Sequence, residues 1–152
     1  MYPDIRVVSI NTGFSRTYGT SPYGDYNTNN ELFLFPVPKD RRLPLKEKVL
    51  AILDGGDAKA YQFSDFSPRG SVIRDNFKGV DYLLIGNSDF IFSYALSASQ
   101  QSLDFRYLTD SDNAPDVVLE DNEGNLWNVF GEADSGPRTG EFLGSVNAMM
   151  GH

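Results

Sequence analysis

The amino-acid sequence predicts a single all-β domain over residues 1–152, built mainly of antiparallel hairpins that form a barrel or a sandwich. Three apolar stretches are each interrupted by a short turn rich in glycine, asparagine and aspartate, at residues 54–57, 86–89 and 121–124. A turn of this composition between two apolar runs is a strong local signal for a β-hairpin. No window of a dozen residues has sustained helical periodicity, so at most one or two short helical turns are expected.

The first half of the chain predicts a strand, a helical turn and a hairpin, in that order. Residues 5–10 are rich in β-branched residues, which favour a strand. Residues 44–48 begin with proline, which suits the first position of a helix, so they are the best candidate for a helical turn. Residues 49–63 predict a hairpin, because the paired glycines at its centre supply the positive φ angles of a tight turn. A shorter strand is predicted at residues 71–74, turned by residues 76–79.

The second half predicts two more hairpins and one further strand. Residues 82–96 and 117–130 each hold two apolar runs around a turn, and Trp127 is expected in the core. Between these hairpins, residues 103–107 alternate apolar and charged side chains. Since successive side chains of a strand point to opposite faces, the apolar residues of this segment share one face and its charges lie in water.

The charge and composition of the chain exclude several classes of partner. A net charge of −8 repels a phosphate backbone, so no nucleic-acid partner is expected. The partners that fit this charge are a small molecule or glycan, a cation, or another protein. No apolar run approaches the roughly 20 residues of a spanning helix, so no membrane span is expected. Residues 1–4 lack the basic start of a signal peptide, and the chain as given is expected to be soluble.

The residue types present also exclude several kinds of active site, and no cofactor or metal is expected. The chain has no cysteine, and its one histidine is His152 at the very end. Catalytic triads and the usual zinc sites need these residues held in place. The run of aspartates at 109–121 is spaced like a calcium loop, but Pro115 stands where that loop has glycine and Asp121 where it has glutamate. We therefore interpret this run as a solvated loop between strands.

Three segments are candidates for a binding site. The loop 15–28, part of a long loop at 11–31, holds three tyrosines among glycines and a proline, which is typical of a folded loop with at least one ring packed as an anchor. The segment 39–48 is locally basic, and the segment 131–140 lies in a second long glycine-rich loop, 131–141. If they bind a ligand, we expect the three to meet at one end of the fold and to form a shallow aromatic and cationic cleft. The alternative is that the tyrosine loop only packs on the core and that the basic charges pair with nearby acids. The candidate ligand-binding residues are Tyr18, Tyr23, Tyr26, Arg42, Lys46, Glu132 and Arg138.

Two functions are open at this point. The first is a non-catalytic ligand-binding, protein-binding or structural module, which the lack of a usable histidine or cysteine favours. The alternative is a glycosidase-like hydrolase, which would need two carboxylates within about 5–10 Å across a pocket. The carboxylates that could form such a pair are Asp25, Asp40, Glu47, Glu132 and Asp134.

Three stretches carry a resemblance to a known family: SRTYGTSPYGDYN, RLPLKEKVLAI followed by GDAKAY, and GNLWNVFGEADSGPRTG. Together they resemble an uncharacterised prokaryotic family catalogued as domain of unknown function 3179, from about residue 14 to the end. The resemblance implies a β-rich domain, often in exported or envelope-associated proteins, and no established activity. Some members carry a cysteine-bearing segment where this chain has GNSDFIFSYAL. Members also usually continue beyond the stretch SVNAMMG, and a missing final strand would leave a sheet edge exposed.

Overall fold

The computed structural model describes residues 13, 19–26, 28–29, 36, 42–109 and 116–151. The chain divides into two units, Met1–Leu45 and Lys46–His152, so a single domain over residues 1–152 stays a prediction. Four of the features singled out from the sequence lie outside the described residues, namely the strand at 5–10, Tyr18, Asp40 and His152.

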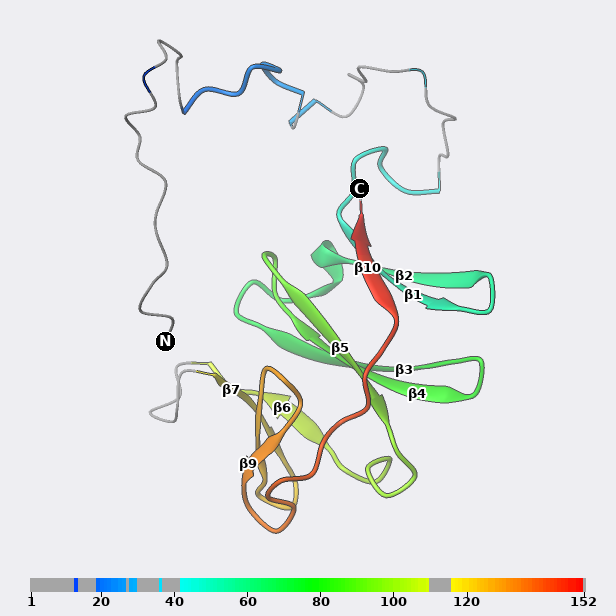
Figure 1. Ribbon diagram of the computed structural model, residues 1–152, viewed down its shortest axis with the longest axis vertical. Helices are drawn as coiled ribbons and strands as arrows, with labels where there is room; N and C mark the ends of the chain where they lie inside the picture. The colour runs from blue at the N-terminus through cyan, green and yellow to red at the C-terminus, as the bar shows by residue number, and fades with distance from the viewer. Residues whose placement is uncertain are drawn as a thin grey trace. The chain divides into compact units, whose positions relative to one another are not determined.

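Within the described residues, the second unit contains ten β-strands in three antiparallel sheets, which confirms the all-β prediction (Figure 1). The strands are β1 Val49–Asp54, β2 Asp57–Gln62, β3 Ser71–Phe77, β4 Val80–Gly86, β5 Ile91–Leu96, β6 Phe105–Tyr107, β7 Val117–Asp121, β8 Leu126–Asn128, β9 Ala133–Ser135 and β10 Ala148–Gly151. The three sheets have the strand orders β10-β1-β2, β3-β4-β5 and β6-β7-β8-β9. None of these described sheets closes on itself, so the barrel, one of the two expected architectures, is not formed by them.

All three hairpins that the turn residues predict are present. β1 and β2 are joined through Gly55 and Gly56, whose φ angles are 57° and 92°. β4 pairs with β5 across the turn at 87–90, and β7 pairs with β8 across the turn at 122–125. Local turn chemistry is therefore sufficient to place these six strands.

The predicted helical turn at residues 44–48 is wrong. These residues form a turn without a helix, and the carbonyl of Lys48 accepts the N–H of Phe63 at 3.3 Å. The pairing of Val49 with Gln62 thus already begins at Lys48, and the segment is a turn that leads into β1. Among the described residues, the one helical segment is the 3-10 turn η1 at Phe63–Asp65, and no helix there is long and apolar enough to cross a bilayer.

One strand is longer than the sequence predicts, and one strand was not predicted. β3 runs on to Phe77, and the turn into β4 is made by Lys78 and Gly79, both with positive φ. The segment 131–141, which was expected to be entirely loop, contains β9. β9 forms because Ala133 pairs with Trp127 of β8, a partner that the sequence of the segment does not specify.

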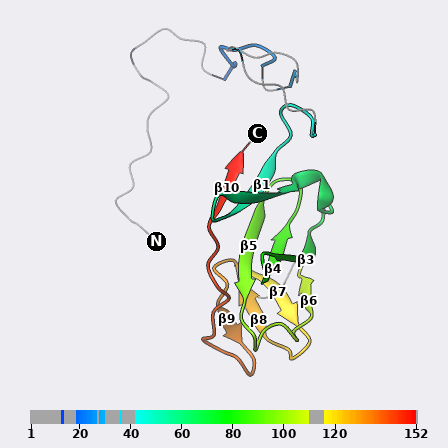
Figure 2. The same cartoon turned by 90° about the vertical axis from the view of Figure 1, so that its right-hand side faces the viewer.

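The sheet β3-β4-β5 lies between the other two sheets (Figure 2). A hydrophobic core packs against each of its faces. On one face Leu83 and Ile85 of β4 pack in the same core as Trp127, which is fully buried as predicted. On the other face Leu84 of β4 packs in the core that contains Ile52 of β1. Because both faces of β4 are covered, its residues 82–85 are continuously apolar and do not alternate.

Candidate functional site

A tight turn after β8 is organised by the buried side chain of Asn128. Its Oδ1 accepts the N–H of Phe130 at 2.9 Å and the N–H of Glu132 at 3.1 Å, while its Nδ2 donates to Asp134 Oδ1 at 2.8 Å. The N–H of Gly131, whose φ is 80°, donates to the carbonyl of Asn128 at 2.9 Å. These bonds hold Phe130 at the tip of the turn, where 75% of the residue is exposed.

The same turn is fixed to the core through Tyr94 of β5. The Tyr94 hydroxyl donates to the carbonyl of Val129 at 2.6 Å. Burial raises the pKa of Tyr94 to about 12, so the hydroxyl remains a donor over the physiological pH range. A Cβ added at Gly131 would lie 3.0 Å from the Tyr94 ring, which shows how closely the backbone rests on it. The backbone beneath Phe130 is therefore rigidly supported.

A second exposed ring lies beside this turn. The N–H of Leu143 donates to the carbonyl of Gly131 at 2.8 Å, and the N–H of Ala133 donates to the carbonyl of Glu141 at 2.9 Å. These bonds flank the bridge between Glu132 and Phe142. In an antiparallel pair, such opposed residues that do not bond to each other have Cα atoms about 4.5 Å apart and side chains on one face.

Phe142 is 58% exposed although Leu143, next to it, is buried in the core. The half-buried carboxylate of Glu132 thus lies next to one exposed phenyl ring and two residues from another. We call Phe130, Glu132 and Phe142 together the aromatic–acidic surface.

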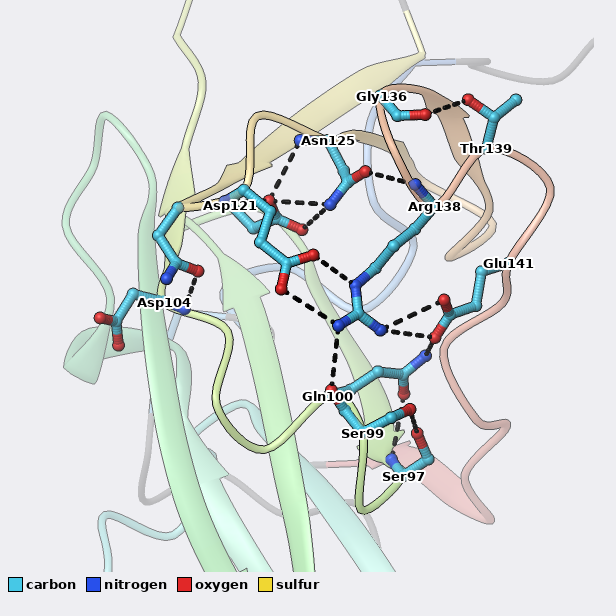
Figure 3. Close-up of polar contacts among 12 residues, drawn as sticks. Ser97, Ser99, Gln100, Asp104, Asp121, Asn125, Gly136, Arg138, Thr139 and Glu141 are labelled. Atoms are coloured by element: carbon cyan, nitrogen blue, oxygen red, sulfur yellow. Dashed lines mark hydrogen bonds and ion pairs between the residues drawn. The ribbon is translucent and has the colours of Figure 1, made fainter.

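The other side of the 131–141 segment is held by Arg138 (Figure 3). Its guanidinium donates to both carboxylate oxygens of Glu123, at 2.7 and 3.2 Å, to Glu141 at 3.3 Å and to the carbonyl of Ser99 at 3.2 Å. Hydrogen bonding to Arg138 lowers the pKa of Glu123, and hydrogen bonding to Glu123 raises the pKa of Arg138. All three nitrogens of the guanidinium therefore donate hydrogen bonds. Arg138 links its own turn to the turns that contain Ser99 and Glu123.

A buried carboxylate supports the neighbouring turn. Asp121, which is 5% exposed, accepts hydrogen bonds from the side chains of Asn125 at 2.8 and 3.0 Å and of Trp127 at 2.8 Å. Asn125 Oδ1 in turn accepts the N–H of Arg138 at 2.7 Å. A Cβ at Gly136, whose φ is 101°, would lie 2.6 Å from Asn125 Oδ1. Glycine at this position is thus needed for contact with the neighbouring turn.

The other residues predicted for the site are divided between the two units. Tyr23 is 59% exposed, and Tyr26 is half-buried with its ring centroid 6.5 Å from that of Tyr23. The N–H of Tyr26 donates to the carbonyl of Tyr23 at 3.2 Å, as expected for a folded loop. Arg42 lies in the first unit and is exposed, whereas Lys46 begins the second and is half-buried. The predicted meeting of the three loops stays a prediction.

Within the second unit, Glu132 and Arg138 do not join in one ion pair. Arg138 binds Glu123 and Glu141, while Glu132 lies beside Phe142. Phe130 and Phe142 were missed by sequence reasoning. The sequence signal for their exposure is weak, because each phenylalanine is next to an apolar residue that packs in or against the core. Only the tertiary structure decides which residue of each pair is exposed to water.

The calcium-like run of aspartates raises the question of metal ligation. No group of three His, Cys, Asp or Glu side chains in the described ranges is placed to hold a metal ion. Of the calcium-like run, residues 110–115 lie outside the described part, and Asp121 at its end is occupied by Asn125 and Trp127.

Comparison with known proteins gives one match. The model of the family "Protein of unknown function (DUF3179)" matches residues 1–151. No curated protein and no solved structure matches. The match covers almost the whole sequence, and it agrees with the three stretches that carry the resemblance. The chain belongs to the family DUF3179.

Proposed function

We propose that this DUF3179 domain is a non-catalytic module that binds a ligand or a protein partner through aromatic and charged side chains of its loops. The observation that carries the proposal is the exposure of Phe130 and Phe142, at 75% and 58%, on backbone held by hydrogen bonds to the core. Burying a phenylalanine side chain stabilises by about 1.5–3 kcal/mol. A ligand that buries these rings gains this free energy on binding. Because hydrogen bonds already hold the backbone, binding does not carry the entropy cost of ordering it.

Three carboxylates of the second unit are paired with cations and are therefore unsuited to act as general acids. Hydrogen bonds to Lys78, Lys59 and Arg138 lower the pKa of Asp57, Asp75 and Glu123, respectively. A carboxyl that acts as a general acid near neutral pH needs the opposite shift, since it must hold its proton there.

The cleft expected from the sequence is part of the same proposal. Tyr23 is an exposed ring in the first unit, and it would add a further face for a ligand. Arg138 would act by positioning the 131–140 loop, because its donors are used within the protein. The residues proposed for this cleft are Tyr18, Tyr23, Tyr26, Arg42, Lys46, Glu132 and Arg138.

A combined binding and stability measurement tests the proposal. The full chain and the variants Tyr23→Ala, Phe130→Ala and Phe142→Ala would be screened against glycan and peptide arrays, and their melting temperatures recorded. We expect at least one ligand whose binding is lost in a variant that melts within about 2 °C of the parent. Val80→Ala is the control, since Val80 is an apolar side chain exposed elsewhere and should change neither property. Equal binding by every variant, or loss of binding only with loss of stability, would contradict the proposal.

A further inference from the structure

We infer that the aromatic–acidic surface binds an arginine-bearing segment of a partner protein. The inference rests on the proposed function and names the class of ligand for this part of the molecule. In the bound state the guanidinium lies against the phenyl rings of Phe130 and Phe142 and pairs with the carboxylate of Glu132.

Glu132 has no cationic partner among the residues that the structure describes. In the described part of the chain its carboxylate makes no hydrogen bond and no ion pair. By contrast, Glu120, Glu123 and Glu141 are each paired with an arginine of the same domain. Asp134, two residues further on, is exposed, and within the described ranges its carboxylate accepts only the Asn128 amide. This end of the second unit therefore carries negative charge that the described residues do not neutralise, in a chain of net charge −8.

Two exposed phenyl rings lie close to Glu132 along the chain or across the bridge. Phe142 is directly opposite Glu132 across the bridge, and Phe130 is two residues before it on a turn held by Asn128. A cation over an aromatic face gains from the ring quadrupole, and arginine does so more often than lysine because its guanidinium is planar and weakly hydrated. A carboxylate next to the ring adds a charge-assisted hydrogen bond to the same group.

The chemistry of the surface favours a basic segment over a glycan. A glycan site needs several donors and acceptors that converge on sugar hydroxyls. The aromatic–acidic surface presents two rings without a polar atom and one charged acceptor. These groups match one cation with an apolar stem, which is the arginine side chain.

The test uses the full chain and a pair of short peptides. One peptide alternates glycine with arginine, and the other has neutral citrulline in place of each arginine; both have blocked ends. Binding is followed by amide chemical shifts in ¹⁵N-labelled protein. We expect the arginine peptide to shift the amides of residues 128–132 and 141–143 in a saturable way, and the citrulline peptide to have no such effect.

Matched variants separate this surface from the overall charge. Glu132→Gln, Phe142→Ala and Phe142→Leu should each weaken binding of the arginine peptide by about three- to thirty-fold, the range of a partly desolvated cation–aromatic contact. Asp104→Asn removes the same charge before β6, at the opposite edge of the sheet from β9, and should change the Kd less than about twofold. The leucine variant keeps an apolar side chain and removes only the ring.

Three results would overturn the inference: an equal effect of Asp104→Asn and Glu132→Gln, equal binding of the citrulline peptide, or shifts confined to other residues. Shifts at these same amides with the citrulline peptide or with a neutral glycan would overturn the arginine class and leave the proposed function standing. No shift at these amides with any peptide or glycan of the screen would overturn both for this surface.

Discussion

Replacing Asn128 by alanine should destabilise the domain by about 2 kcal/mol. The change removes the acceptor of two backbone N–H groups, those of Phe130 and Glu132, at 2.9 and 3.1 Å. It also removes the donor to Asp134, but that carboxylate is exposed and is solvated by water at little cost. Each partly buried N–H that loses its partner costs about 1 kcal/mol, which gives the total. For a chain of this size, 2 kcal/mol corresponds to a fall of about 6 °C in melting temperature.

The assay is urea unfolding of the parent and of Asn128→Ala, with thermal melting as a second measure. Asn122→Ala is the matched control, because the Asn122 side chain accepts one exposed backbone N–H, that of Asp104, at 2.9 Å. We expect the control to lose less than half as much stability. If Asn128→Ala unfolds within about 0.5 kcal/mol of the parent, the turn is not organised by this side chain and the rigid support inferred for Phe130 is wrong.

Three further predictions concern glycines and pH. Gly136→Ala should destabilise the domain by about 2 kcal/mol or more, since the added Cβ would lie 2.6 Å from Asn125 Oδ1. Gly140→Ala should cost about 1 kcal/mol, because Gly140 has a similar φ of 83° but open space around it. Denaturant unfolding of both variants measures this difference. Gly56→Val should cost about 1–2 kcal/mol, because a β-branched residue is strained at φ 92°, and an unchanged melting temperature would contradict this. Folding lowers the pKa of Glu123 below its ordinary value of 4.5. The bond between Glu123 and Arg138 therefore contributes its full stability above pH 4.5. This contribution is lost as the pH falls through the lowered pKa. Arg138→Gln should therefore flatten the loss of stability in acid, and unfolding curves of equal pH dependence for both proteins would contradict it.

The sequence by itself determined the features whose cause is local. Paired glycines at 55–56 impose positive φ, so the first hairpin could be placed from the turn alone. Alternation at residues 103–107 correctly placed Leu103 inside and Arg106 in water, because the period of a strand is two wherever it lies. The burial of Trp127 followed from its size and its position in an apolar run.

Predictions failed where a partner elsewhere in the chain decides the conformation. Proline at the start of residues 44–48 suited a helix, but the carbonyl of Lys48 is taken by Phe63, fifteen residues on. The glycines of 131–141 suggested a loop, yet residues 133–135 pair with β8 as β9. Local preference is worth tenths of a kcal/mol per residue, and one pairing with a neighbouring strand outweighs it.

Only the tertiary structure decided which side chains are available to a partner. Arg138 looked like a free cation in sequence, but its nitrogens are satisfied by Glu123, Glu141 and a carbonyl 39 residues away at Ser99. Phe130 and Phe142 were not singled out in the sequence, yet they are exposed while Val129 and Leu143 beside them pack in or against the core. Burial and pairing depend on contacts between segments far apart in the chain, and no local pattern of residue types encodes them.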